Sequence, residues 1–126
     1  MEKLIIENTL NSPRVVLDPG EGHFEFSGES RPENVRSFYL PILEWLEDFA
    51  KKCKDPVEFL FAFEYFNSTS AKYILDIFKI LNSLHASGVK VSVKWQYEED
   101  DEDMYEVGVE MSRMSDLPFE YVKIEV

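Results

Sequence analysis

Residues 57–78, VEFLFAFEYFNSTSAKYILDIF, decide how this chain folds. The first ten, Val57 to Phe66, are almost all apolar or aromatic, which predicts a central strand with both faces covered. From Tyr73 onward, apolar residues recur at three- and four-residue spacing, which predicts an amphipathic helix. The four polar residues between them, Asn-Ser-Thr-Ser at 67–70, mark the point where the buried strand becomes the helix.

The elements on either side extend this pattern. The helix should bury Tyr73, Ile74, Ile77, Phe78, Leu81 and Leu84, and Gly88 should end it. Upstream, residues 3–8, 14–18 and 23–27 are expected to form an antiparallel meander, because turn residues separate these short apolar runs. Pro32 is expected to open a further helix. Pro41 should kink or divide that helix, at a cost of roughly 3 kcal/mol.

Downstream, residues 89–97 alternate as a strand, six acids follow at 98–103, and a helix around 104–114 precedes an edge strand at 118–126. The unit from Val57 to Tyr97 should be a right-handed parallel crossover. We therefore expect an α/β fold in which a mixed sheet of about five to six strands carries about three helices. The whole chain, residues 1–126, should be a single domain.

Composition limits the function. The chain has 13 basic and 25 acidic residues, a net charge of −12, which repels nucleic acid phosphates and anionic lipids. Nucleic acid and membrane are therefore not expected as partners, and no apolar run is long enough to span a bilayer. The single cysteine, Cys53, can form no internal disulfide, which suits a cytoplasmic location. Lys51, Lys52 and Lys54 would lower its pKa.

The polar cluster has two interpretations. Loops at the carboxyl ends of strands carry ligands and chemistry in open α/β sheets, and the helix directs its N–H groups and positive dipole end at residues 67–70. A phosphoryl group there gains roughly 0.3–1 kcal/mol from the dipole. Asn, Ser and Thr are also preferred N-caps, worth about 1 kcal/mol, so one of these residues is expected to cap the helix.

Other candidate sites are weaker. The acids Glu98 to Asp103 lack the spacing and glycine of a calcium loop and suit a solvated helix start, with docking of a basic partner as a secondary role. His23 and His85 build no catalytic constellation, and no glycine-rich phosphate loop or paired-cysteine motif occurs. No catalytic residue, metal site or cofactor is therefore expected. Trp45 lies off the main stripe of its helix, either packed on another element or exposed as a partner anchor.

Several fragments resemble one family. The segment FEYFNSTSAKYIL, the leading SPRVVLDP and GHFEFSGES, the helix RPENVRSFYLPILEWL and the late VKWQYEEDDEDM are similar in order to the SiaC family of bacterial regulatory phosphoproteins. The loop also resembles the phosphorylated turn of STAS-domain anti-sigma-factor antagonists. Unlike that turn, it contains no glycine, so its backbone is less permissive.

The resemblance implies a non-enzymatic partner switch in c-di-GMP signalling. A cognate Ser/Thr kinase would phosphorylate the loop, a PP2C-type phosphatase would reverse this, and the unphosphorylated form would bind and activate an effector such as a diguanylate cyclase. Ser68, directly after Asn67, corresponds to the phosphoacceptor, with Thr69 as the neighbouring choice. Asn67, Thr69, Ser70 and Lys72 would contact partners, with Ser70 either capping the helix or allowing close approach.

An alternative from the residues alone is a small anion- or nucleotide-binding domain or enzyme that uses the same helix N-terminus. A purely structural subunit is a third alternative.

Overall fold

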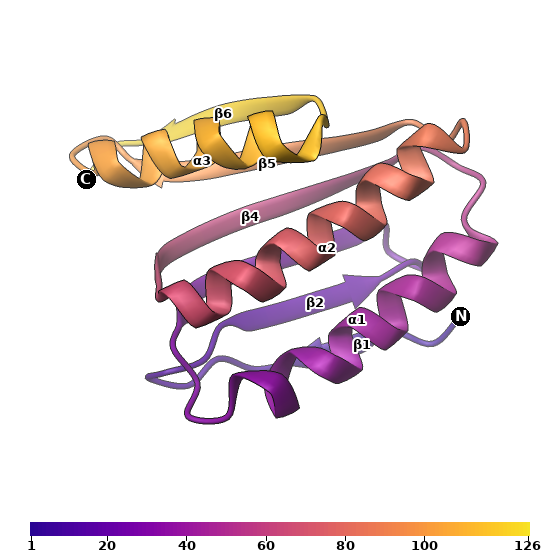
Figure 1. Ribbon diagram of the computed structural model, residues 1–126, viewed down its shortest axis with the longest axis horizontal. Coiled ribbons are helices and arrows are strands. Elements are labelled where there is room, and N and C mark those ends of the chain that lie inside the picture. Colours follow the sequence, from indigo (N-terminus) through magenta and orange to yellow (C-terminus); the bar gives the residue numbers. More distant parts are fainter.

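One mixed six-stranded sheet carries three helices in the computed structural model, which describes residues 1–126 (Figure 1). The strands lie in chain order across the sheet. The elements are β1 (Leu4–Ile6), β2 (Arg14–Asp18), β3 (His23–Ser30), α1 (Val35–Lys52), β4 (Val57–Phe66), α2 (Ser68–Ala86), β5 (Val91–Glu98), α3 (Glu102–Ser115) and β6 (Phe119–Ile124). The predicted fold class is confirmed.

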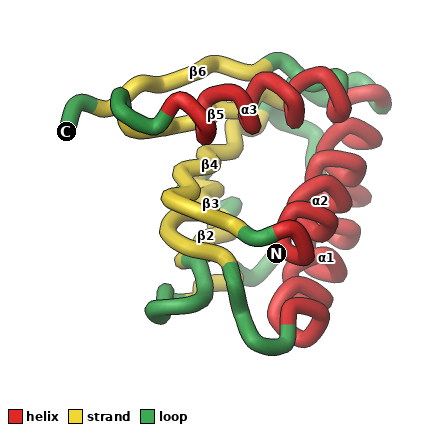
Figure 2. Tube along the Cα trace, turned by 60° about the vertical axis from the view of Figure 1, so that its left-hand side comes forward, coloured by secondary structure: helices red, strands yellow, loops and turns green.

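The chain builds the sheet in two ways. β1, β2 and β3 form the predicted antiparallel meander. From β3 onward each new strand is parallel to its predecessor and joined to it by a helix. Because these crossovers all step in one direction across the sheet, right-handed connections place all three helices on the same face (Figure 2). The carboxyl ends of β3, β4 and β5 and the N-termini of the helices that follow them therefore meet at one rim.

The prediction that β4 is covered on both faces is wrong. Its alternate residues Val57, Phe59, Phe61 and Phe63 are buried under the helices. Glu58, Leu60, Ala62 and Glu64 lie on the opposite face, where no helix packs, and the two acids are exposed. Acids at the two ends of that row can stay hydrated there, and Glu58 pairs with Lys94 of β5 at 3.6 Å.

Aromatic rings fill the space between the sheet and the helices. Phe61 of β4 stacks on Phe26 at 5.1 Å between ring centroids and contacts Phe78 of α2 at 4.7 Å. The predicted stripe of α2 is buried except for Tyr73, which is half-buried and stacks on Tyr39 of α1 at 5.6 Å. Gly88 follows the end of α2 with φ of +108°, a left-handed conformation that glycine adopts without strain.

β4 contains one extra residue near its end. Gly28 of β3 pairs with Phe63, but the next residue, Glu29, pairs with Tyr65, so that Glu64 has no counterpart on β3. This bulge reverses the sidedness of the last residues of the strand. Tyr65 is 49% exposed, whereas Phe66 turns inward and lies edge-on to Phe63 at 5.4 Å.

α1 begins later than predicted, and of the two effects expected of Pro41 it does not show division of the helix. The helix begins at Val35 rather than at Pro32, because the side chain of Asn34 accepts the N–H of Ser37 at 3.1 Å and caps it. Pro41 does not divide the helix, which runs on to Lys52. Pro41 lies on the exposed side, where water can satisfy the carbonyl of Ser37 that loses its helical partner.

α3 lies unusually close to β5. A Cβ atom on Gly108 would lie only 2.4 Å from Cδ1 of Trp95, and the Trp95 indole donates to the carbonyl of Met104 at 3.0 Å. The absence of a side chain at Gly108 therefore allows the helix to rest on the indole ring. This contact places the start of α3, and the acids around it, at the rim.

The side chains of Trp45 and Cys53 both make contacts within the fold. Trp45 is half-buried, stacks on Phe49 at 5.3 Å, and donates its indole N–H to the carbonyl of Glu2 at 2.9 Å, so the packing interpretation holds. The expected lowering of the Cys53 pKa is wrong, because burial raises the pKa of the thiol, which donates to the carbonyl of Asp55. No helix of the structure combines the length and apolar composition needed to cross a bilayer.

Candidate functional site

Asn67 caps α2. Its backbone is extended, with φ of −85° and ψ of 174°, and its side-chain oxygen accepts the N–H of Ser70 at 2.9 Å. The same oxygen accepts the hydroxyl of Thr69 at 2.9 Å, and the Asn67 carbonyl accepts the N–H of Ala71 at 3.0 Å. One residue of the loop therefore caps the helix as expected, and none of the three hydroxyls is needed for that role.

Ser70 is not a surface residue, which corrects both roles expected for it. Its side chain is fully buried, and its hydroxyl donates to the carbonyl of Ser30 at 2.9 Å. Ser30 in turn donates its own hydroxyl to the Ser70 oxygen at 2.9 Å, and the Tyr39 hydroxyl bonds to Ser30. Ser70 therefore joins α2 to β3 and α1 beneath the loop, where it can neither cap the helix nor touch a partner.

Tyr39 completes this buried hydroxyl triad of Ser30, Tyr39 and Ser70. Burial raises the pKa of Tyr39 to about 12, although its hydrogen bonds to serines oppose the shift. The phenol thus stays protonated and donates to Ser30, which is itself a donor to Ser70. Ser30 is absent from the predicted site residues because the strand was predicted to end at Ser27, whereas β3 runs to Ser30. Continuing the alternation of Phe24 and Phe26 would have placed Ser30 inside.

Ser68 and Thr69 are exposed, in contrast to Ser70. They are the first two residues of α2, so their N–H groups lack helical acceptors and point away from the helix at its positive end. Lys72 is also exposed and lies one turn after Ser68, so the two side chains share a face of α2. Asn67, Ser68, Thr69 and Lys72 thus form a small polar surface, which we call the hydroxyl loop.

The acidic run at 98–103 supplies a neighbouring helix start. Glu98 ends β5, and Asp101 caps α3 by accepting the N–H of Met104 at 3.0 Å. Glu102 and Asp103 form the first turn of α3, where negative charge is favoured by the dipole. The expected solvated helix start is therefore what the structure contains.

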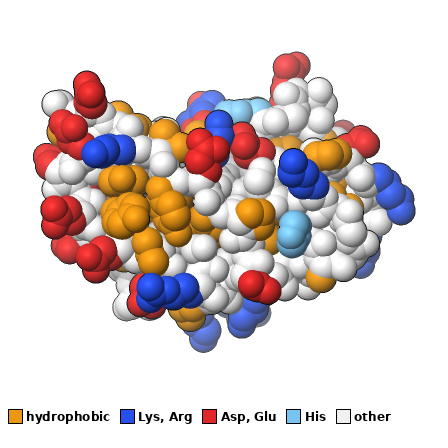
Figure 3. Space-filling view, turned by 90° about the horizontal axis from the view of Figure 1, so that it is seen from above, with side chains coloured by type: hydrophobic (Ala, Val, Ile, Leu, Met, Phe, Trp, Pro, Cys, Tyr) orange, Lys and Arg blue, Asp and Glu red, His pale blue; other side chains and the backbone are white.

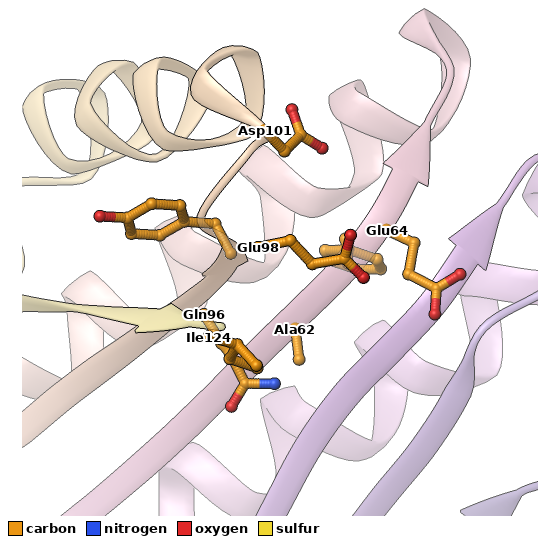
Figure 4. Close-up of a pocket in the computed structure, with 8 residues that line it drawn as sticks. Ala62, Glu64, Gln96, Glu98, Asp101 and Ile124 are labelled. Carbon is orange, nitrogen blue, oxygen red and sulfur yellow. The ribbon is translucent and has the colours of Figure 1, made fainter. Parts of the chain in front are cut away.

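A depression of about 330 Å³ lies toward the carboxyl ends of β4 and β5, mainly on the helix-free face of the sheet (Figure 4). Three carboxylates line it, those of Glu64 on β4, Glu98 on β5 and Asp101 before α3. Their negative charge disfavours an anionic ligand. Ser68 and Thr69 line none of the four main depressions on the surface. Of the residues in the hydroxyl loop, Lys72 lines a depression of about 500 Å³ between α2 and the end of α3, whereas the two exposed hydroxyls lie outside it.

Comparison with known proteins identifies the family. A family model described as SiaC family regulatory phosphoprotein matches residues 6–124. The chain belongs to the SiaC family. This SiaC-family chain is 29% identical over 119 residues to an uncharacterized protein of Pseudomonas aeruginosa strain UCBPP-PA14, with 94% of each chain covered.

Solved SiaC structures from Pseudomonas aeruginosa share the fold. One is a complex of the diguanylate cyclase SiaD with its activator SiaC; it matches with a TM-score of 0.91 and 28% identity, covering 96% of this chain and 99% of that chain. The structure of apo-SiaC matches with a TM-score of 0.88 and 29% identity, covering 97% and 99%. The family predicted from the sequence is confirmed.

Proposed function

We propose that this chain is a non-enzymatic, partner-switching phosphoprotein whose switch is the hydroxyl loop. Ser68 is the phosphoacceptor, and Thr69 is the next candidate. The observation that carries this proposal is the separation of roles among adjacent residues: Asn67 caps the helix, Ser70 is buried, and only Ser68 and Thr69 are exposed. A kinase can therefore reach these two hydroxyls without unfolding the helix start.

The phosphate changes the loop mainly by its charge. A phosphoserine adds about two negative charges and three acceptor oxygens. At position 68 these would lie beside the free N–H groups of α2 and one turn from Lys72, which forms no ion pair in the fold. Favourable interaction with the dipole is worth roughly 0.3–1 kcal/mol, so the modified loop keeps its conformation.

The partner responds to that charge. Neutral hydroxyls can be buried against another protein at modest cost when they find hydrogen bonds, whereas a buried dianion without a cationic partner is far more costly. Phosphorylation therefore releases the effector that binds the unmodified loop. By similarity to SiaC, which activates the diguanylate cyclase SiaD, the effector is a diguanylate cyclase. A cognate Ser/Thr kinase and a PP2C-type phosphatase set the charge state.

Phosphorylation in vitro tests the acceptor. Incubation with the cognate kinase and ATP should add one phosphate, and peptide mass spectrometry should place it on Ser68. Ser68→Ala should abolish the modification, whereas Thr69→Ala, which changes the neighbouring exposed hydroxyl, should leave it intact. A phosphate outside residues 68–69 would refute the site.

Effector binding tests the switch. With a purified diguanylate cyclase as the probe, calorimetry should show that the phosphorylated chain binds at least about tenfold more weakly than the unmodified chain, a difference of roughly 1.4 kcal/mol. Ser68→Ala should bind like the unmodified chain in the presence of kinase and ATP. Equal affinity of the two forms would disprove partner switching, even if Ser68 is the acceptor.

The alternative of an anion- or nucleotide-binding domain is not favoured by the surface around Ser68 and Thr69, because neither residue lines any of the four main depressions. Thermal-shift measurements with nucleotides and sugar phosphates distinguish the two functions. The proposed switch predicts no stabilisation by these compounds, whereas a rise in Tm that Ser68→Asp abolishes would favour the alternative.

A further inference from the structure

The free edge of β6 is an open surface that the hydroxyl loop does not include. β6 is the last strand of the sheet and pairs only with β5. The carbonyls of Pro118 and Ile124 accept N–H groups from Val93 and Glu99, at 3.0 and 2.8 Å. Since alternate residues of a strand face opposite neighbours, Glu120 and Val122 also bond toward β5. The N–H and C=O groups of Phe119, Tyr121 and Lys123 therefore point outward, with no strand beside them.

A cluster of tyrosines flanks this edge. Tyr105 of α3 lies 5.3 Å from Tyr121 of β6 and 5.1 Å from Tyr97 of β5, measured between ring centroids. Tyr105 is 38% exposed, and Ile124 at the end of the strand is 37% exposed. Figure 3, which views the molecule from the α3 and β6 side, shows hydrophobic side chains gathered in one region, with acidic side chains along its outer side and basic side chains beside it as well. Exposed aromatic and aliphatic groups beside an unpaired edge favour binding of an extended chain.

The acidic residues around the edge of β6 favour a positively charged segment as its binding partner. Residues 98–126 contain eleven acidic residues and only two basic ones, Arg113 and Lys123. A positively charged segment would gain from this field, and its backbone would satisfy the outward groups of β6. A second copy of the chain would instead bring two such acidic regions together, so the charge opposes edge-to-edge dimerisation.

We propose that the edge of β6 is a second docking surface, which takes a positively charged extended segment of a partner protein by β-strand addition. β5 lies between β6 and β4, the strand that leads into the hydroxyl loop, so the two surfaces are separate. The tyrosine cluster contacts apolar side chains of the bound segment, and the surrounding acids contact its lysines or arginines. This proposal does not depend on phosphorylation of Ser68.

A designed peptide tests the surface on the full chain. The probe is a fluorescein-labelled eight-residue peptide that alternates lysine and valine, and its control carries proline at two central positions. Fluorescence anisotropy should detect binding of the first peptide and not of the proline control. The affinity of the first peptide should fall at least tenfold between 0.05 and 0.5 M salt, because the Debye length shortens to about 4 Å at the higher concentration. Amide chemical shifts should change most at residues 119–125.

Matched variants separate the backbone from the side chain. Lys123→Pro removes an outward N–H while leaving the bonds between β5 and β6 intact, and it should weaken peptide binding at least fivefold. Lys123→Ala removes the same side chain but keeps the N–H, so it should bind at least as tightly as the unaltered chain. Tyr105→Ser should weaken binding severalfold.

Three results would overturn the proposal. One is binding by Lys123→Pro that equals binding by Lys123→Ala. Another is a pattern in which the amides that shift on peptide binding lie away from β6. This measurement uses the unaltered chain, so it does not depend on how the variants fold. The third is sedimentation showing a dimer that Lys123→Pro dissociates, because the occupant of the edge would then be a second copy.

Discussion

Replacing Ser70 by alanine should destabilise the protein, although the substitution shortens a side chain by one atom. The Ser70 hydroxyl donates to the Ser30 carbonyl and accepts from the Ser30 hydroxyl, both at 2.9 Å. The carbonyl keeps its bond from the Asn67 N–H at 3.2 Å, but the buried Ser30 hydroxyl loses its acceptor. Leaving one buried donor unsatisfied costs about 1–3 kcal/mol.

The helix preference of alanine offsets part of this cost, by about 0.5 kcal/mol. We therefore expect a net loss of about 0.5–2.5 kcal/mol. For a chain of this length each kcal/mol lowers Tm by about 4 °C, so Tm should fall by about 2–10 °C. Urea denaturation followed by circular dichroism measures the free energy, and the slope against urea should be unchanged because the fold is the same.

The neighbouring serine and threonine are matched controls. Ser68→Ala and Thr69→Ala change exposed hydroxyls, and each should alter stability by less than about 0.5 kcal/mol. Tyr39→Phe, which removes the other partner of Ser30, should couple with Ser70→Ala, so that the double variant differs from the sum of the two. If Ser70→Ala is as stable as Ser68→Ala, the buried triad does not hold α2 in place.

Three further predictions concern the fold and its charges. Gly108→Ala should destabilise by up to about 2 kcal/mol in urea denaturation, because overpacking against Trp95 costs about 1–3 kcal/mol and the gain in helix preference offsets roughly 1 kcal/mol of that; greater stability would contradict the close contact. Asn67→Ala should cost about 1 kcal/mol through loss of the N-cap, and an unchanged Tm would show that the helix is capped otherwise. Burial alone would raise the pKa of Glu25, but hydrogen bonds from Ser27, His23 and Arg14 lower it below its ordinary value of 4.5. Glu25 therefore stabilises the fold above that pH and loses its contribution as pH falls further, so the Tm difference between the unaltered chain and Glu25→Gln should shrink below pH 4.5.

The order and type of every element could be predicted from the sequence. Residues 57–66 form a continuous apolar run of strand length, the repeat from Tyr73 is helical, and Gly88 ends the helix where its positive φ is needed. The apolar run alone did not show that helices cover only one face of β4. The acids Glu58 and Glu64 were the signal that one face of β4 meets water, although the apolar residues between them obscured it.

The site was only partly predictable for a similar reason. The position of the loop follows from the boundary between strand and helix, and the four polar residues are adjacent in sequence. The stripe of Ile74, Ile77 and Leu81, extended back by one turn, places Ser70 on the buried face of α2, so the burial of Ser70 was readable from the helical period. Its hydroxyl partner Ser30 lies 40 residues away in sequence, and local pattern carries no information about that pairing.

The unpaired residue in β4 has a consequence for how the chain tolerates changes in length. Deleting Glu64 would leave a regular ladder in which Phe63 and Phe66 still point inward and Tyr65 still points out. The side chains after position 64 would therefore keep their orientation relative to the sheet. Deleting one residue between Phe66 and Ser70 would instead rotate the following side chains by roughly 100° about the helix axis. Relatives of this chain should therefore differ in length before Tyr65, and scarcely ever between the inward phenylalanine and the buried serine.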